Sequence, residues 1–175
     1  MQGRVEQVPT TRVLTVLLLA GALLSGPTAA RAEPPPVLSS LWGWPLPGEP
    51  TVTRAFDVLP SRYAAGHRGV DLAGTVGTPV LAAGAGVVAF AGMVAGRPVV
   101  SVQHPDGLRT TYEPVLPGVA AGQAVARGSP LGSLVAGHAG CPVEACLHWG
   151  LRRADSYLDP LVLLRVPRVR LLPWP

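Results

Sequence analysis

Ala65-Gly66-His67-Arg68-Gly69-Val70-Asp71-Leu72 is the stretch around which the rest of the chain can be understood. Its glycines disfavour a helix, because each glycine in a helix interior costs about 1 kcal/mol relative to alanine. We therefore predict an extended segment, in which alternate residues share a face, so that His67, Gly69 and Asp71 point the same way. Gly69 adds no side chain between the imidazole and the carboxylate, which leaves room for an ion held by both.

A histidine and an aspartate in this arrangement form half of a metal site. We predict zinc as the ion, and a catalytic zinc takes three protein ligands with a fourth position open to water or substrate. The third ligand has to come from elsewhere in the chain. Cys146-Leu147-His148-Trp149 offers His148 as that ligand.

The composition argues against a nucleic-acid partner. The chain has 175 residues, enough for one domain with a proper core. All of its basic charge is arginine, and the formal net charge is +4. Residues 1–32 carry Arg4, Arg12 and Arg31 against Glu6, which leaves only +2 for the remainder. That charge is too weak and too dispersed to predict nucleic-acid binding.

Residues 1–32 have the pattern of a secretory signal peptide. Arg4 and Arg12 form a basic region, residues 13–24 an apolar core, and Ala30-Arg31-Ala32 a small-x-small cleavage site. The apolar core is too short for a membrane span, and the cleavage site argues against the alternative of an uncleaved anchor. We expect a protein outside the cytoplasmic membrane, secreted or in the cell envelope, with no membrane attachment after cleavage.

The remainder predicts an all-β domain. Residues 33–50 are rich in proline and indicate an extended lead-in, which Trp42 and Trp44 would pack onto the domain. No sustained helical periodicity follows, and residues 165–175 form a tail that is either an edge strand or a frayed terminus. Between them, residues 51–164 contain short β-prone runs broken by glycine and proline, at 51–56, 69–73, 79–82, 86–91, 98–103, 108–113 and 147–152. His104-Pro105-Asp106-Gly107 is predicted to be a hairpin turn, with His104 most simply a turn residue.

Several motifs in this order resemble the M23 family of zinc metallopeptidases, the lysostaphin and LytM-like peptidoglycan endopeptidases. The motifs are His67-x3-Asp71, Gly77-Thr78-Pro79-Val80 with Gly86-Val87-Val88, Gly122-Gln123 to Gly128 with Leu131-Gly132, and Leu147-His148 before Asp159-Pro160. The resemblance extends from about residue 51 to residue 163. It implies a compact fold of antiparallel sheets with a groove, one Zn²⁺, and hydrolysis of peptide bonds in wall cross-links. It also implies that His67, Asp71 and His148 are the zinc ligands.

The chain departs from the family pattern at two further histidines, which orient or deprotonate the water and stabilise charge. Cys146 and Pro114 stand at their positions. Positioned acid and base groups typically contribute about 10²- to 10⁴-fold to a rate, so their loss predicts a slow enzyme or none unless another group substitutes. We predict Tyr112 as the remaining donor, because on a strand it shares the face of position 114 while Glu113 faces away. His138, in the loop before Cys141, is the second candidate.

Three states are open to Cys146. A disulfide to Cys141 is favoured, because the chain is expected in an oxidising compartment. A thiolate on zinc would give a closed, structural site, and a buried free thiol is the third alternative.

Two functions follow from these observations. One is a zinc endopeptidase acting on peptidoglycan peptides, expected as a monomer. The other is a catalytically degenerate module that binds wall peptide or regulates another cell-wall hydrolase. A β-domain with incidental ligand-like residues is disfavoured, because three ligands stand in register.

Overall fold

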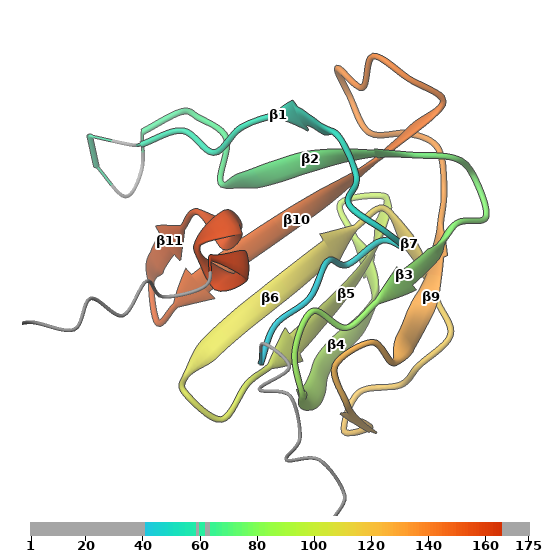
Figure 1. Ribbon diagram of the computed structural model, residues 1–175, viewed down its shortest axis with the longest axis vertical. Coiled ribbons are helices and arrows are strands. Elements are labelled where there is room, and N and C mark those ends of the chain that lie inside the picture. The colour runs from blue at the N-terminus through green and yellow to red at the C-terminus, as the bar shows by residue number, and fades with distance from the viewer. Residues whose placement is uncertain (1–40, 59, 62–63, 166–175) are drawn as a thin grey trace, which may run out of the picture. The chain divides into compact units, whose positions relative to one another are not determined.

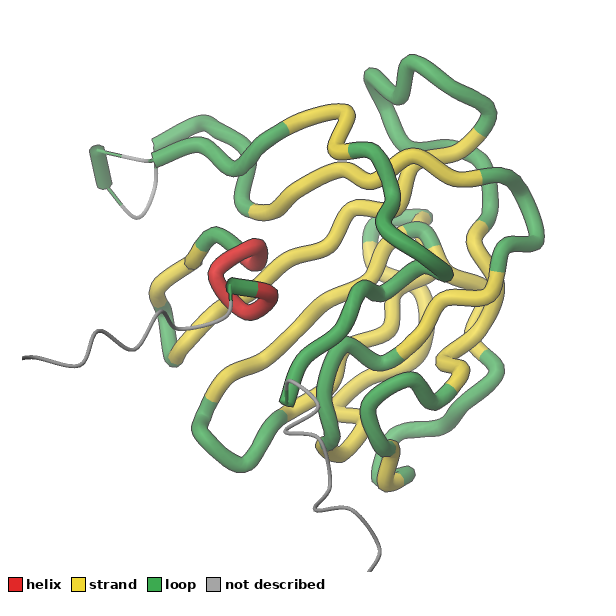
Figure 2. The backbone as a smooth tube through the Cα atoms, in the orientation of Figure 1, coloured by secondary structure: helices red, strands yellow, loops and turns green. Residues whose placement is uncertain are grey.

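In the computed structural model, residues 41–58, 60–61 and 64–165 are described. This part of the chain is built almost entirely from antiparallel strands, as Figure 1 and Figure 2 show, and the predicted all-β class is confirmed. The larger sheet runs in the order β1 (Val52–Arg54), β2 (Gly69–Gly74), β10 (Ala145–Arg153), β6 (Leu108–Glu113), β5 (Arg97–Gln103), β4 (Gly86–Val94) and β8 (Ala124–Val125), and β11 (Ser156–Leu158) pairs with β10. The smaller sheet has the order β3 (Pro79–Leu81), β9 (Pro130–Leu134) and β7 (Val115–Pro117).

The long strand β10 lies between β2 and β6, and its pairing determines which side chains share a face of the sheet. His148 pairs with Asp71 on one side and with Glu113 on the other. Residues directly opposite in antiparallel strands have side chains on the same face. Asp71, His148 and Glu113 therefore belong to one face of the sheet, while Leu147 and its alternate neighbours on β10 face the other side, toward the core.

The core joins the two sheets. Val70, Leu72, Leu147 and Trp149 contribute from the larger sheet, and all four are fully buried. Residues of all three strands of the smaller sheet belong to the same apolar cluster, and they are Val80, Val115, Leu131 and Leu134. The core therefore packs against one face of β2 and β10 and holds in place the opposite face, which carries Asp71 and His148.

The lead-in packs on the domain in its described part. Trp42 and Trp44 lie against the apolar cluster as expected, and Leu46 is itself buried. The rings of Trp44 and Trp149 have centroids 6.4 Å apart. The predicted signal peptide, the lead-in up to residue 40 and the tail from residue 166 lie outside the described residues. Within the described residues, no helix has the length and apolar character needed to cross a membrane.

The predicted strands correspond to β1 to β6 and β10, with end-points that differ by at most three residues. β7, β8, β9 and β11 were not predicted, because strands of two to five residues are too short to show a clear alternation. Val125 of β8 and Leu131 and Leu134 of β9 are buried. The chain leaves β11 through a 3₁₀ helix, η1 (Pro160–Leu164), whose first turn is capped by the Asp159 carboxylate accepting from the Leu161 N–H at 3.0 Å.

Candidate metal centre

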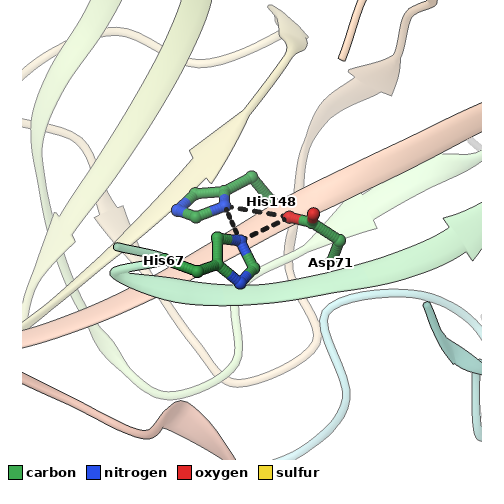
Figure 3. Close-up of side chains that lie close together, drawn as sticks. All are labelled: His67, Asp71 and His148. Carbon is green, nitrogen blue, oxygen red and sulfur yellow. Dashed lines mark hydrogen bonds and ion pairs between the residues drawn. The ribbon is translucent and has the colours of Figure 1, made fainter. Parts of the chain in front are cut away.

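Three side chains from three places in the chain meet at one point. His67 lies just before β2, Asp71 is on β2, and His148 is on β10. Figure 3 shows their side chains turned toward one another. His67 Nε2 is 2.9 Å from Asp71 Oδ1 and 3.0 Å from His148 Nδ1, and His148 Nδ1 is 3.0 Å from Asp71 Oδ1.

The backbone orients the His67 ring. Its Nδ1 is 2.7 Å from the Ala55 carbonyl, which can only accept, so Nδ1 carries the proton. The His67 N–H also donates to Asp57 Oδ2 at 2.7 Å. A neutral His67 then presents the Nε2 lone pair to the site. Metal-binding histidines are commonly oriented by such a contact at their other nitrogen.

The arrangement of these three atoms is better suited to binding a cation than to hydrogen bonding among themselves. With His67 neutral, only His148 Nδ1 can supply a proton to the triangle, and one proton serves one contact. The His67 Nε2 and Asp71 Oδ1 lone pairs then face each other at 2.9 Å. Ligands of a tetrahedral zinc with bonds of about 2.0–2.1 Å lie about 3.3 Å apart. The donor set and its spacing therefore suit zinc.

The charge on Asp71 completes this fit. The side chain is buried, with 3% of the residue exposed. Burial alone would raise the pKa of Asp71, but hydrogen bonds from His138 and His148 hold it well below the usual range of a carboxyl group. Asp71 is therefore ionised at neutral pH and can bind a metal ion.

Gly69 is required at its position by close contacts. His67 precedes β2 rather than lying on it, so the predicted alternation from residue 67 to residue 71 is not a single strand face. The absence of a side chain at position 69 still matters. A Cβ there would lie 2.5 Å from the Trp149 carbonyl oxygen and 2.8 Å from His148 Nε2. Gly69 thus leaves room for the His148 ring itself.

An open cavity of about 380 Å³ adjoins the site. His67 and His148 line it together with His138, so a molecule in the cavity can reach the metal-binding atoms. Arginine side chains and Glu113 form much of the remaining wall. Glu113 is in ion-pair contact with Arg97. Arg97 was not singled out from the sequence, and Glu113 was predicted to face away from the site. The place of Glu113 beside the site follows from the pairing of β6 with β10.

Tyr112 is not at the site, which corrects the prediction. Its side chain is fully buried on the core face of β6, where the hydroxyl accepts from the Ala83 N–H at 2.9 Å and lies 2.8 Å from Thr110 Oγ1. Burial raises its pKa to about 12, although the hydrogen bonds oppose this. The expectation that Tyr112 faces the metal site was wrong. Glu113 occupies that face.

His138 does reach the site. Its Nε2 is 3.0 Å from Asp71 Oδ2, and its ring stacks on that of His148 with centroids 5.7 Å apart and an interplanar angle of 25°. His138 belongs to a loop between β9 and β10. A loop sequence has no periodicity from which the position of its side chains can be predicted. It does not belong to the group of three residues whose ligand atoms all lie within 4.8 Å of one another.

Cys141 and Cys146 form a disulfide, the favoured prediction. The alternatives of a zinc thiolate and of a free thiol at Cys146 therefore do not hold in this structure. Cys146 is two residues from His148 on β10, and its bond to Cys141 joins the His138 loop to the strand that carries a proposed ligand.

The comparisons with known proteins agree with this geometry. Residues 65–160 match the family described as Peptidase family M23. The chain is 49% identical over 168 residues to an uncharacterized protein of Mycobacterium tuberculosis, with 93% of this chain and 65% of that protein covered. The chain thus spans about two thirds of the length of this relative.

Several solved structures have a similar fold. The Helicobacter pylori protein Csd3 matches with a TM-score of 0.59 and 25% identity, over 76% of this chain and 37% of that one. A putative peptidase M23 from Pseudomonas aeruginosa matches with a TM-score of 0.54 and 26% identity, over 73% and 51% of the two chains. A mutant catalytic domain of the prophage-encoded M23 protein EnpA from Enterococcus faecalis matches with a TM-score of 0.53 and 25% identity, over 67% and 94%.

Proposed function

The chain belongs to peptidase family M23, and we propose that it is an exported zinc metalloendopeptidase that cleaves peptide cross-links of bacterial peptidoglycan. The observation that carries the proposal is the triangle formed by His67 Nε2, Asp71 Oδ1 and His148 Nδ1 beside an open cavity. Three ligands and an accessible fourth position are the arrangement of a catalytic zinc. Export rests on the signal-peptide pattern of residues 1–32, and a disulfide is consistent with it.

The chain's own residues supply orientation and access. His67 is held by the Ala55 carbonyl, Asp71 by β2, and His148 by β10, so the three donors are in place before any ion binds. A peptide bound in the cavity would lie next to these donors. When bound, zinc would act as a Lewis acid that polarises a peptide carbonyl and makes water more acidic. The arginines on the cavity wall would hold carboxylates of a wall peptide.

Incubation of the zinc-loaded protein with purified peptidoglycan tests this proposal. We expect new amino termini to appear with time, and we expect His148→Ala to release none while retaining the fold by circular dichroism. Substrates with different cross-links are needed, since the shape of the cavity does not specify the bond that is cut. A folded, zinc-loaded protein that cleaves none of them would contradict the endopeptidase function.

The two replaced histidines support a second candidate. Cys146 is committed to a disulfide and Pro114 has no acid or base group, so neither can move a proton. The alternative is a module that binds wall peptide or regulates another cell-wall hydrolase. It predicts that the zinc-loaded protein sediments with peptidoglycan but releases no amino termini. Sedimentation and cleavage measured on the same sample distinguish the two functions.

A further inference from the structure

The two carboxylate oxygens of Asp71 have different partners. Oδ1 faces His67 Nε2 and His148 Nδ1, whereas Oδ2 faces His138 Nε2 at 3.0 Å. We propose that His138 is a positioning residue that holds Asp71 as a one-oxygen zinc ligand, and that the Cys141–Cys146 disulfide fastens the loop that carries His138. The inference rests on the zinc site of the proposed function, but it does not require that the protein cleave a peptide.

The geometry of the carboxylate supports this role. A carboxylate oxygen can only accept, so His138 Nε2 donates its proton to Oδ2. A carboxylate with both oxygens free can rotate or bind a metal through two oxygens. The contact from His138 occupies one oxygen and leaves Oδ1 directed at the two histidines. With 14% of its side chain exposed, His138 is well enclosed, and its stacking on His148 limits its movement.

The disulfide secures the position of His138. The Cys141 N–H donates to the His138 carbonyl at 3.3 Å, so the two residues belong to one tight turn. Cys141 is then bonded covalently to Cys146, which is on β10 and pairs with Ala73 of β2. The loop is thereby attached to the two strands that carry Asp71 and His148. Without this bond, the loop would have more conformational freedom to lose on closing over the site.

Zinc affinity measured by competition with a chromogenic chelator tests the first part. Loss of a hydrogen-bond partner of a metal ligand typically costs about 10- to 100-fold in affinity, and we expect this loss for His138→Ala. His138→Gln retains an N–H donor, lacks the ring that stacks on His148, and is a poor zinc ligand. We expect it to restore part of the affinity, which separates hydrogen bonding from both stacking and direct coordination.

Two results would overturn this part. They are an affinity of His138→Ala equal to that of the unaltered protein, and an affinity of His138→Gln as low as that of His138→Ala. Circular dichroism establishes that each variant is folded. His148→Ala, which removes a proposed ligand, marks the affinity of a broken site. If the unaltered protein binds zinc no better than His148→Ala, the zinc site of the proposed function fails as well. If it binds tightly and His138→Ala is unchanged, only the present inference fails.

A double-mutant cycle tests the second part. The Cys141→Ala and Cys146→Ala double variant should bind zinc more weakly than the unaltered protein, because the His138 loop is released. In a His138→Ala background the same pair of substitutions should change zinc affinity little, because the contact between His138 and Asp71 that the disulfide secures is already absent. Equal losses in both backgrounds would contradict the link between the disulfide and His138. Alanine is used in place of serine or free thiols so that no new metal ligand is introduced.

Discussion

At the scale of single residues, a chain of buried hydrogen bonds surrounds His104. Its Nδ1 donates to the Ala85 carbonyl at 2.8 Å, so its Nε2 accepts from the Thr110 hydroxyl at 2.8 Å. Thr110 in turn accepts from the Tyr112 hydroxyl, which accepts from the Ala83 N–H. These directions are those of a neutral imidazole, in which each group of the chain has a partner. Burial lowers the pKa of His104 below its ordinary value, against the opposing effects of the Ala85 carbonyl and of Asp106.

This arrangement predicts a loss of stability in mild acid. The unfolded chain takes up a proton at His104 near pH 6.5, whereas the folded chain does so only at lower pH. The free energy of unfolding contributed by this group is therefore complete above about pH 6.5 and falls as the pH drops toward the folded pKa. We expect the free energy of unfolding, measured by chemical denaturation, to differ less between pH 7 and pH 5 for His104→Asn than for the unaltered protein. An unchanged difference would contradict the neutral, buried His104.

Gly69 offers a second test at this scale. Gly69→Ala drives a Cβ into the Trp149 carbonyl and the His148 ring, and we expect a loss of about 1–3 kcal/mol in the free energy of unfolding together with weaker zinc binding. Gly150→Ala is the matched control, because a Cβ there meets nothing closer than 3.6 Å. Denaturation and chelator competition on both variants measure the contrast. Equal behaviour of the two variants would show that close packing at Gly69 does not position His148.

Single residues also show how far sequence reasoning reaches. The proposed ligands could be read from the chain because few side chains bind zinc and the family motifs fix their order. His104 begins the predicted turn, since its carbonyl accepts from the Gly107 N–H at 3.2 Å. Its burial, with only 3% of the residue exposed, was not predicted, because its partners Ala85 and Thr110 are brought to it by strand pairing. Tyr112 was assigned to the wrong face. The rule that alternate strand residues share a face held, but nothing local indicated which face of β6 looks toward the metal-binding side chains.

At the scale of elements, β10 separates the site from the core. Its position as a strand was predicted, but its place between β2 and β6 was not, because pairing partners far apart in the chain leave no local pattern. The cross-strand pairs His148–Asp71 and His148–Glu113 depend on that placement. His138 was recognised only as a loop residue with access to the groove. Its contact with Asp71 depends on the fold of the loop between β9 and β10 and could not be derived from spacing.

Two adjacent residues of β10 should therefore respond oppositely to truncation. Leu147 is fully buried in the core, so Leu147→Ala should lower the free energy of unfolding by about 2–5 kcal/mol. A partial loss of zinc binding would follow only through unfolding. His148→Ala should abolish tight zinc binding and cost little stability in the absence of metal. Denaturation with and without a chelator measures both variants. A large loss of metal-free stability in His148→Ala would contradict the separation of the two faces.

At the scale of the whole molecule, the cavity carries more positive than negative charge. Arg54, Arg68 and Arg97 line it, against Glu113. We expect wall peptides with free carboxylates to bind more tightly than the same peptides with amidated carboxylates. The preference should weaken between about 0.05 M and 0.5 M salt, because salt screens exposed charges. Calorimetric titration of both peptides into the zinc-loaded protein measures it, and equal affinities at low salt would contradict an electrostatic role for the arginines.

The account as a whole depends on one metal ion held by His67, Asp71 and His148. Elemental analysis of the protein after zinc reconstitution and removal of loose metal is the most direct test. The account predicts one zinc per chain, with His148→Ala retaining far less under the same treatment. A folded protein that contains no zinc as purified, and gains none on reconstitution, would contradict the metal centre and with it both the proposed chemistry and the role assigned to His138.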